Sequence, residues 1–301
     1  MKTIKTLRKI KITHPLLALG MRALAKWETR RGVFSNSPPI LIYQMGQVGS
    51  STVYRTLREA KLPNPIYKVH FLSQDLHEHR KKHEKAGFIP PPYHFFIAEA
   101  LQKFLSREPQ VSCKIISLVR DPIAIEISGL FQNSFFVKNS LRTPTGSICP
   151  QKASRYLERK FKKVDKFQYI NEWFDRELKS VFGIDVFATP FPVDKGYAIY
   201  EKTNIELLII RLEALSDKGP RVLSKFIGLD KPLQLKQANR RKNTDDAEIY
   251  HKVLKSLCLE PSLCQQLYSS RYVQHFYDEL MIKTFISRWT QNWHMSTSTS
   301  A

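Results

Sequence analysis

Residues 43–57, YQMGQVGSSTVYRTL, place glycines and hydroxyl side chains between an apolar run and a helical pattern. Gly46 and Gly49 would let the backbone come close to an anion, and the hydroxyl residues that follow would add donors at the first helical turn. A helix N-terminus also presents unpaired N–H groups and a partial positive charge. The segment therefore predicts a loop that binds phosphate or a similar anion. Its candidate binding residues are Gly46, Gln47, Val48, Gly49, Ser50, Ser51 and Thr52.

The loop lacks the lysine of an ordinary nucleotide site. In the pattern G-x-x-x-x-G-K-[ST] a lysine follows the second glycine. Here Ser50 follows Gly49, and Gln47 and Val48 lie between the glycines. An ATP or GTP site of that kind is therefore disfavoured. A tight strand-to-helix turn with a Ser or Thr cap is an equally good interpretation of this segment taken alone.

A second group of polar residues follows the apolar run KIISLV at 114–119. Arg120 comes directly after it, Asp121 and Pro122 suit the cap and first turn of a helix, and Ser128 lies eight residues after the arginine. An Arg at a strand end and a Ser on the next helix can hold one phosphate together, with the guanidinium as a planar donor fork. The alternative is an ion pair between Arg120 and Asp121 with a buried serine.

These segments resemble the PAPS-dependent sulfotransferases, which use 3′-phosphoadenosine 5′-phosphosulfate. In that family the 5′-phosphosulfate loop reads roughly K-x-G-[ST]-[ST], and GQVGSST matches it except at Gln47. The family's 3′-phosphate motif is an Arg followed eight residues later by a Ser, as in Arg120 and Ser128. The segments LIIRLEALSDKGPRVLSKFIGLD and YKVHFL are similar to two further family segments.

The longer pattern, which includes INEWFDRELKSVFGIDVF and RKNTDDAEIY, is similar to a sulfotransferase-like branch described as putative capsular polysaccharide synthesis proteins. The resemblance covers about residues 39–280. It implies PAPS as the sulfuryl donor, a hydroxyl of a carbohydrate or polysaccharide as the acceptor, and no metal. Acceptor specificity would lie in the segments 73–95 and 134–155.

The resemblance implies catalytic roles for three residues. His70 would take the proton of the acceptor hydroxyl, and Lys68, two residues earlier, would face the same side of the strand. A core or hydrogen-bonded histidine is the alternative for His70. In the family a loop lysine polarises the bridging oxygen of PAPS, and Gln47 takes its place here. Lys68 or another cation could reach in, backbone N–H groups could suffice at a slower rate, or the site could bind nucleotide without transferring sulfate.

Two other functions stay open. One is a catalytically inactive relative that binds a nucleotide or glycan, which Gln47 would explain. The other is a nucleotide-dependent kinase with a degenerate P-loop. The missing loop lysine and the absence of an evident Mg²⁺-binding acid near the loop count against a kinase.

Apolar runs alternate with helical patterns, which predicts an α/β fold with a central parallel sheet. We expect a P-loop-like three-layer fold with about four or five strands, flanking helices and a helical C-terminal part. The domains would be a basic extension at 1–38, a sulfotransferase-like domain at 39–290 and a disordered tail at 291–301. The expected strands are ILIY at 40–43, IYKVHF at 66–71, KIISLV at 114–119, IDVFATPF at 184–191 and ELLIIRL at 206–212.

The composition favours anionic partners. Lys and Arg outnumber Asp and Glu by 48 to 27, which gives a net charge of +21. This charge selects no particular partner, and we expect no specific nucleic acid. Residues 1–31 carry nine Lys or Arg and one acid, so they could contact an anionic membrane or form a solvated basic helix. Four cysteines without paired spacing indicate reduced thiols and a cytoplasmic protein, with membrane association as an option.

Other groups of residues have simpler interpretations. The stretch DLHEHRKKH resembles a metal site, but it fails the H-E-x-x-H pattern, and a solvated helix face is the better interpretation. Trp173 and Phe174 suit the core of an amphipathic helix, and Glu213 suits a structural or capping role. The run NRRKN at 239–243 could contact a phosphate or an acidic acceptor, or form a solvated charge run.

Overall fold

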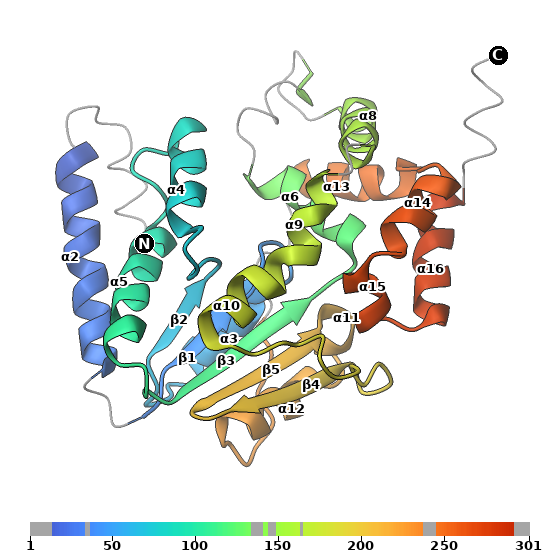
Figure 1. Ribbon diagram of the computed structural model, residues 1–301. Coiled ribbons are helices and arrows are strands. Elements are labelled where there is room, and N and C mark those ends of the chain that lie inside the picture. The colour runs from blue at the N-terminus through green and yellow to red at the C-terminus, as the bar shows by residue number, and fades with distance from the viewer. Residues whose placement is uncertain are drawn as a thin grey trace, which may run out of the picture.

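The computed structural model of the protein describes residues 14–33, 37–133, 141–143, 149–162, 165–236 and 245–291. A five-stranded sheet lies at its centre, in the order β2-β1-β3-β5-β4 (Figure 1). The four strands β1, β2, β3 and β5 are parallel, and β4 pairs antiparallel at one edge. The strands are β1 Ile40–Tyr43, β2 Ile66–Val69, β3 Cys113–Val119, β4 Tyr197–Lys202 and β5 Ile205–Arg211. The mixed α/β fold with a mostly parallel sheet is as predicted.

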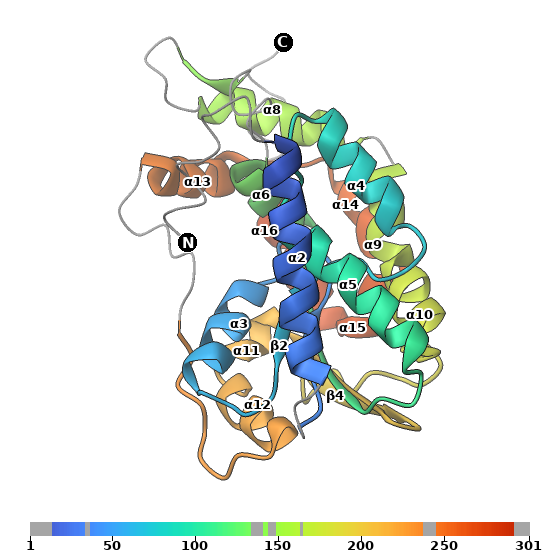
Figure 2. The ribbon, with the colours of Figure 1, turned by 90° about the vertical axis from the view of Figure 1, so that its left-hand side faces the viewer.

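Helices lie on both faces of this sheet. Figure 2 shows α3 and α12 on one side of the strands and α5, α9 and α10 on the other. The helices up to residue 173 are α2 His14–Val33, α3 Ser50–Glu59, α4 Leu76–Lys85, α5 Tyr93–Arg107, α6 Pro122–Asn133, α8 Pro150–Phe161 and α9 Asp165–Trp173. A π-helical segment, Phe174–Lys179, and α10 Ser180–Phe182 follow α9. The later helices are α11 Leu212–Leu215, α12 Gly219–Ile227, α13 Asp245–Ser256, α14 Pro261–Tyr268, α15 Arg271–Phe276 and α16 Glu279–Thr290.

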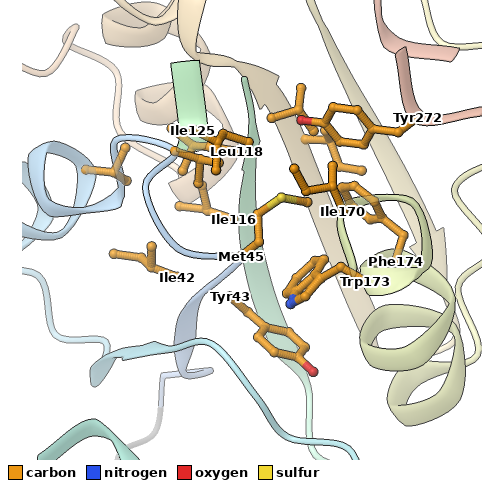
Figure 3. Packing of buried hydrophobic residues seen from close by; sticks show 14 of the residues in the cluster. Ile42, Tyr43, Met45, Ile116, Leu118, Ile125, Ile170, Trp173, Phe174 and Tyr272 are labelled. Carbon is orange, nitrogen blue, oxygen red and sulfur yellow. The ribbon is translucent and has the colours of Figure 1, made fainter. Parts of the chain in front are cut away.

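The central strands are buried on both faces, which explains why their sequences do not alternate between apolar and polar residues. All four residues of β1 are buried, and so are six of the seven residues in β3 and in β5. Figure 3 shows Ile42 and Ile116 on one face of the sheet, and Tyr43 and Trp173 on the other. Trp173 and Phe174 are each 1% exposed, which confirms their predicted place in the core.

The register of the strands decides which face each polar residue occupies. Ile42 of β1 pairs with Lys68 of β2 on one side and with Ile116 of β3 on the other. Paired residues in a sheet point to the same face, because side chains alternate along each strand. Lys68 therefore lies on the same face as Ile42, where α3 contacts both β1 and β2.

One predicted strand is wrong. Residues 184–191 form turns, in which the Asp185 side chain accepts a hydrogen bond from Phe187 N at 3.0 Å. The segment is apolar because Ile184, Val186 and Phe191 are buried in the core, and not because it belongs to the sheet. The strand at this edge is instead β4, a half-exposed strand that the sequence interpretation missed.

The C-terminal part is helical as predicted. Helices α13 to α16 occupy the region, and α14 begins at Pro261 as expected. No disulfide joins the four cysteines, all of which lie in the described part of the chain. Residues 1–13 and 292–301 lie outside the described residues, so the predicted basic extension and tail are described only in part.

Candidate functional site

The loop between β1 and α3 turns sharply at Gly49. This residue precedes α3 with φ of 91°, in the left-handed region that glycine adopts without strain. A Cβ atom there would lie 2.5 Å from Leu212 Cδ1, so the position also lacks space for a side chain. No side chain caps α3; in its first turn Thr52 N donates to the backbone oxygen of Gly49 at 3.1 Å, and no side-chain cap takes up the N–H groups of Ser50 and Ser51. A Cβ atom on Gly46 would meet nothing within 4 Å, so the space beside this glycine is open.

The structure brings Arg120 and Ser128 together, and it brings both to the loop. Arg120 Nη1 donates to Ser128 Oγ at 2.7 Å and to the backbone oxygen of Gln47 at 2.9 Å. Asp121 does not take up the guanidinium, because its carboxylate caps α6 by accepting from Ile123 N at 2.9 Å. The guanidinium is therefore directed at the loop, and the alternative of a local ion pair does not describe this site.

Two tyrosines from the C-terminal helices hold this pair in place. The Tyr272 hydroxyl accepts from Arg120 N and donates to Arg120 O, both at 2.9 Å. Tyr272 is fully buried, and burial raises the pKa of its hydroxyl, which stays protonated and able to donate. Tyr250 OH lies 3.4 Å from Ser128 Oγ. The sequence interpretation missed both residues, since they lie more than 100 residues from their partners.

Lys68 reaches the loop from the neighbouring strand. Its Nζ donates to Ser51 Oγ, in the first turn of α3, at 3.0 Å. Burial lowers the pKa of Lys68 from its ordinary value. A lysine thus lies at the start of α3, although the loop sequence itself contains none.

His70 lies just after β2 and contacts the segment after β1. Its Nδ1 lies 2.8 Å from the backbone oxygen of Gln44, and because a carbonyl only accepts, Nδ1 carries the proton and Nε2 has the lone pair. Burial is the main cause that lowers the pKa of His70 to about 4. Trp173 Nε1 donates to the His70 backbone oxygen at 3.2 Å, which fixes this turn from the other face. The imidazole is therefore neutral and held in one tautomer near pH 7.

Two glutamines beside the loop carry buried polar atoms without a partner among the described residues. Gln44 is fully buried, and neither its Oε1 nor its Nε2 is hydrogen bonded. Gln47 Oε1 is also buried and unpartnered, and the residue has φ of 69°, which is rare outside glycine. A buried polar atom without a partner costs about 1–3 kcal/mol. Such atoms, gathered at one loop, mark a place where a bound polar group would be stabilised.

A buried carboxylate, Glu177, positions the chain that follows His70. It lies in the π-helical segment and is 2% exposed. It accepts from Leu72 N at 2.8 Å, from Ser73 N at 2.9 Å, and from the hydroxyls of Ser73 and Tyr43. Burial raises the pKa of Glu177, and the four donors oppose that rise. No pattern in the sequence singles out this glutamate, because its partners come from distant segments.

The remaining predicted residues border this cluster in structural positions. Glu213 accepts from Asp121 N at 3.1 Å and from Tyr277 OH at 3.3 Å, as a structural residue would. His77 is exposed as expected, but His79 stacks on Phe71 with ring centroids 3.8 Å apart, so that face is only partly solvated. No group of three or more His, Cys, Asp or Glu in the described ranges could hold a metal ion.

Parts of the predicted site fall outside the described residues. These parts are the run NRRKN at 239–243 and, within the expected acceptor segment 134–155, residues 134–140 and 144–148. The other expected acceptor segment, 73–95, is described throughout and contains α4.

The comparisons with known proteins address the C-terminal half of the chain. Residues 148–278 match the NKWYS family model, described as "Putative capsular polysaccharide synthesis protein". None of the curated proteins and none of the solved structures compared with the chain matches it. The NKWYS match includes Glu177, Tyr250 and Tyr272, which position the site, whereas the loop and Arg120 lie before it.

Proposed function

We propose that the protein is a sulfotransferase that moves a sulfuryl group from PAPS to a hydroxyl of a carbohydrate. The observation that carries the proposal is the position of Arg120, which donates both to Ser128 and to the backbone oxygen of Gln47. A guanidinium, a hydroxyl and a glycine-containing loop before a helix thus meet at one place. Each of them binds phosphate, and PAPS carries phosphate at both its 3′ and 5′ positions.

The donor would be held at two points in a P-loop-like arrangement. The N–H groups at the start of α3 and the hydroxyls of 50–52 would hold the 5′-phosphosulfate. Arg120 and Ser128 would hold the 3′-phosphate. Support comes from the open space beside Gly46 and from the unpartnered amide atoms of Gln44.

Lys68 would supply the cation that the loop lacks. Its Nζ already lies 3.0 Å from Ser51 Oγ at the start of α3. As the bond between sulfur and the leaving oxygen breaks, negative charge develops on that oxygen, and a nearby ammonium stabilises it more in the transition state than in the ground state. Of the three options that Gln47 leaves open, this geometry favours a lysine reaching in from β2.

His70 would act as the general base. Its Nε2 lone pair would take the proton of the acceptor hydroxyl while the hydroxyl oxygen bonds to sulfur and the nucleotide leaves. A pKa of about 4 makes the imidazole a weak base, but an anionic sulfuryl group nearby raises the pKa of a histidine. His70 contacts Gln44 before the loop and Lys68 contacts Ser51 after it. Base and cation would thus lie at the two ends of the loop, as attack in line with the leaving oxygen requires.

The acceptor class rests on two further observations. The NKWYS description concerns capsular polysaccharide synthesis, which supports a carbohydrate acceptor and a part in polysaccharide synthesis. The net charge of +21 suits an anionic donor and an acidic glycan.

Calorimetry with 3′-phosphoadenosine 5′-phosphate (PAP) and with ATP tests the donor site. We expect tight binding of PAP and weak binding of ATP. Incubation with labelled PAPS and a panel of glycans, lipids and small phenols then tests transfer. Binding of ATP alone would point to a kinase. Binding of PAP without transfer to any acceptor would point to an inactive nucleotide-binding relative, the alternative that Gln47 favours.

A further inference from the structure

Helix α2 has one face against the protein and another whose large apolar side chains are exposed. It packs along α5, and in Figure 2 it lies outermost, across the front of the molecule. The packed face carries Met21, Ala25 and Thr29, which are spaced by four and all buried. The spacing of four defines one side of a helix, and residues two positions away, such as Leu19 and Trp27, lie on the opposite side.

The outer face is apolar. Leu16 is 71% exposed, Leu19 63%, Leu24 43% and Trp27 53%. Only three other large apolar side chains in the described part of the chain are as exposed, and they lie on three separate segments. Leu16, Leu19 and Trp27 fall on one stripe of the helix, with Leu24 beside it. A concentration of exposed apolar side chains on one face marks an interaction surface.

Basic side chains border this apolar stripe. Arg22 and Lys26 lie along one edge of it, and Arg30 lies within it near the C-terminal end of the helix; all three are exposed. The one acid in α2 is Glu28, which lies on the side of the helix toward the protein. The sequence ahead of α2 adds five more Lys or Arg, at positions 2, 5, 8, 9 and 11.

We propose that the outer face of α2 docks on an anionic lipid surface. A helix with leucines and a tryptophan on one face, bordered by Lys and Arg, lies in the plane of a membrane interface and binds anionic lipids. No helix in the described part of the chain is long and apolar enough to cross a bilayer, so α2 would lie on the surface. A second copy of this chain fits the face less well, because two molecules of charge +21 repel each other.

Helix α2 is hydrogen bonded to β2, the strand that carries Lys68 of the candidate site. Tyr67 of β2 donates to the backbone oxygen of Glu28 in α2 at 3.0 Å, and Lys68 is the next residue along the strand. Docking through α2 would therefore hold the β2 edge of the sheet toward the bilayer, whereas the Lys68 side chain faces α3 on the other side of the strand. The proposal does not depend on the sulfotransferase assignment, because it rests on α2 alone.

Vesicle sedimentation with the full chain tests the proposal. We expect binding to vesicles of phosphatidylcholine mixed with phosphatidylserine, little binding to phosphatidylcholine alone, and release at high salt. The double variant Leu16→Ser/Leu19→Ser should bind at least about tenfold more weakly, because it removes apolar surface from the interface. The triple variant Arg22→Gln/Lys26→Gln/Arg30→Gln should lose roughly fivefold per charge removed.

Two controls make the test specific. Leu280→Ser changes a leucine that is 76% exposed on α16 and should leave binding unchanged. In a Trp293→Phe background, since Trp293 lies outside the described residues, the emission of Trp27 should shift to shorter wavelength on vesicles, and Trp27→Phe should remove that shift. Trp173 and Trp289 are each 1% exposed and would report little of it.

Three results would overturn the proposal. They are a failure to bind the phosphatidylserine vesicles, equal binding by the Leu16→Ser/Leu19→Ser variant, and equal binding to neutral vesicles. Analytical ultracentrifugation tests whether a second copy of the chain covers this face instead of lipid. A dimer that the Leu16→Ser/Leu19→Ser variant abolishes would show that it does, and would also overturn the proposal.

Discussion

Replacing Lys68 by methionine should remove most of the turnover without destabilising the fold. Lys68 is partly buried, and burial lowers its pKa from the ordinary value of 10.5. The unfolded chain therefore holds the lysine proton more tightly than the folded one does, so charged Lys68 costs stability below its folded pKa. That cost disappears as the pH rises toward 10.5. Methionine keeps the length of the stem and carries no charge, so the thermal midpoint at neutral pH should stay the same or rise.

The expected loss of activity follows from the position of the ammonium. Removing one preorganised donor from a developing negative charge lowers kcat by about 10²–10³-fold, which corresponds to about 2.7–4 kcal/mol. We expect a loss of about 10²-fold for Lys68→Met with saturating labelled PAPS and the best acceptor of a glycan panel. The affinity for PAP should fall as well, because the leaving oxygen that Lys68 would stabilise stays on the 5′-phosphate of PAP as negative charge. Lys114→Met is the matched control, since Lys114 pairs with Glu206 at the opposite end of the sheet.

A second variant tests whether Lys68 replaces the missing loop lysine. Gln47→Lys alone should leave turnover flat or lower it, because the new ammonium meets the like charge of Lys68. In the double variant Gln47→Lys/Lys68→Met the loop lysine has no competitor, and part of the lost activity should return. Turnover of Lys68→Met within about threefold of the wild type, about 0.6 kcal/mol, would refute this assignment of the cation.

Three further predictions concern the rest of the site. Arg120→Ala should weaken PAP binding, measured by calorimetry, by about 2 kcal/mol. Arg58→Ala, which changes an exposed arginine of α3, is the control and should leave the affinity unchanged. Unchanged affinity in a folded Arg120→Ala variant would show that Arg120 is not part of the donor site. His70→Ala should lower turnover by about 10²-fold at unchanged PAP affinity. In the wild type kcat/KM, which reports the free enzyme, should fall only as the pH drops toward about 4, where His70 becomes protonated. A limb of kcat/KM near the ordinary histidine value would contradict this. Gly49→Ala should lower the thermal midpoint, because φ is 91° at this position. Gly46→Ala should keep the fold and weaken PAP binding, because a methyl group would occupy the open space beside the loop. Normal PAP binding by Gly46→Ala would show that the donor does not approach this glycine closely.

The sequence determined those parts of the site that depend on neighbours in the chain. A strand that ends in glycines and hydroxyl residues before a helix forms the same turn wherever the strand lies, so the loop and the start of α3 were predictable. Arg120 and Ser128 were predictable as a pair, because a strand end and the following helix bring them together. The parallel sheet followed from buried apolar runs separated by helices.

Sheet topology was predictable only in part. The run at 184–191 has the composition of a buried strand, yet it packs as turns, because burial alone does not distinguish a strand from an apolar turn in the core. Strand β4 is half-exposed and ends in a hairpin at Thr203, where φ is 52°. Strand β4 was not predicted because its sequence is only weakly apolar, although all of its residues pair with β5.

Only the tertiary structure decided how the loop acquires a lysine and how its partners are held. Lys68 reaches Ser51 because β2 pairs with β1 in a register that places Lys68 beside Ile42. Tyr272 reaches the backbone of Arg120 across 152 positions, and Glu177 reaches Ser73 across 104. Contacts of such separation depend on how elements pack and not on any local pattern, so the spacing of residues along the chain could not reveal them.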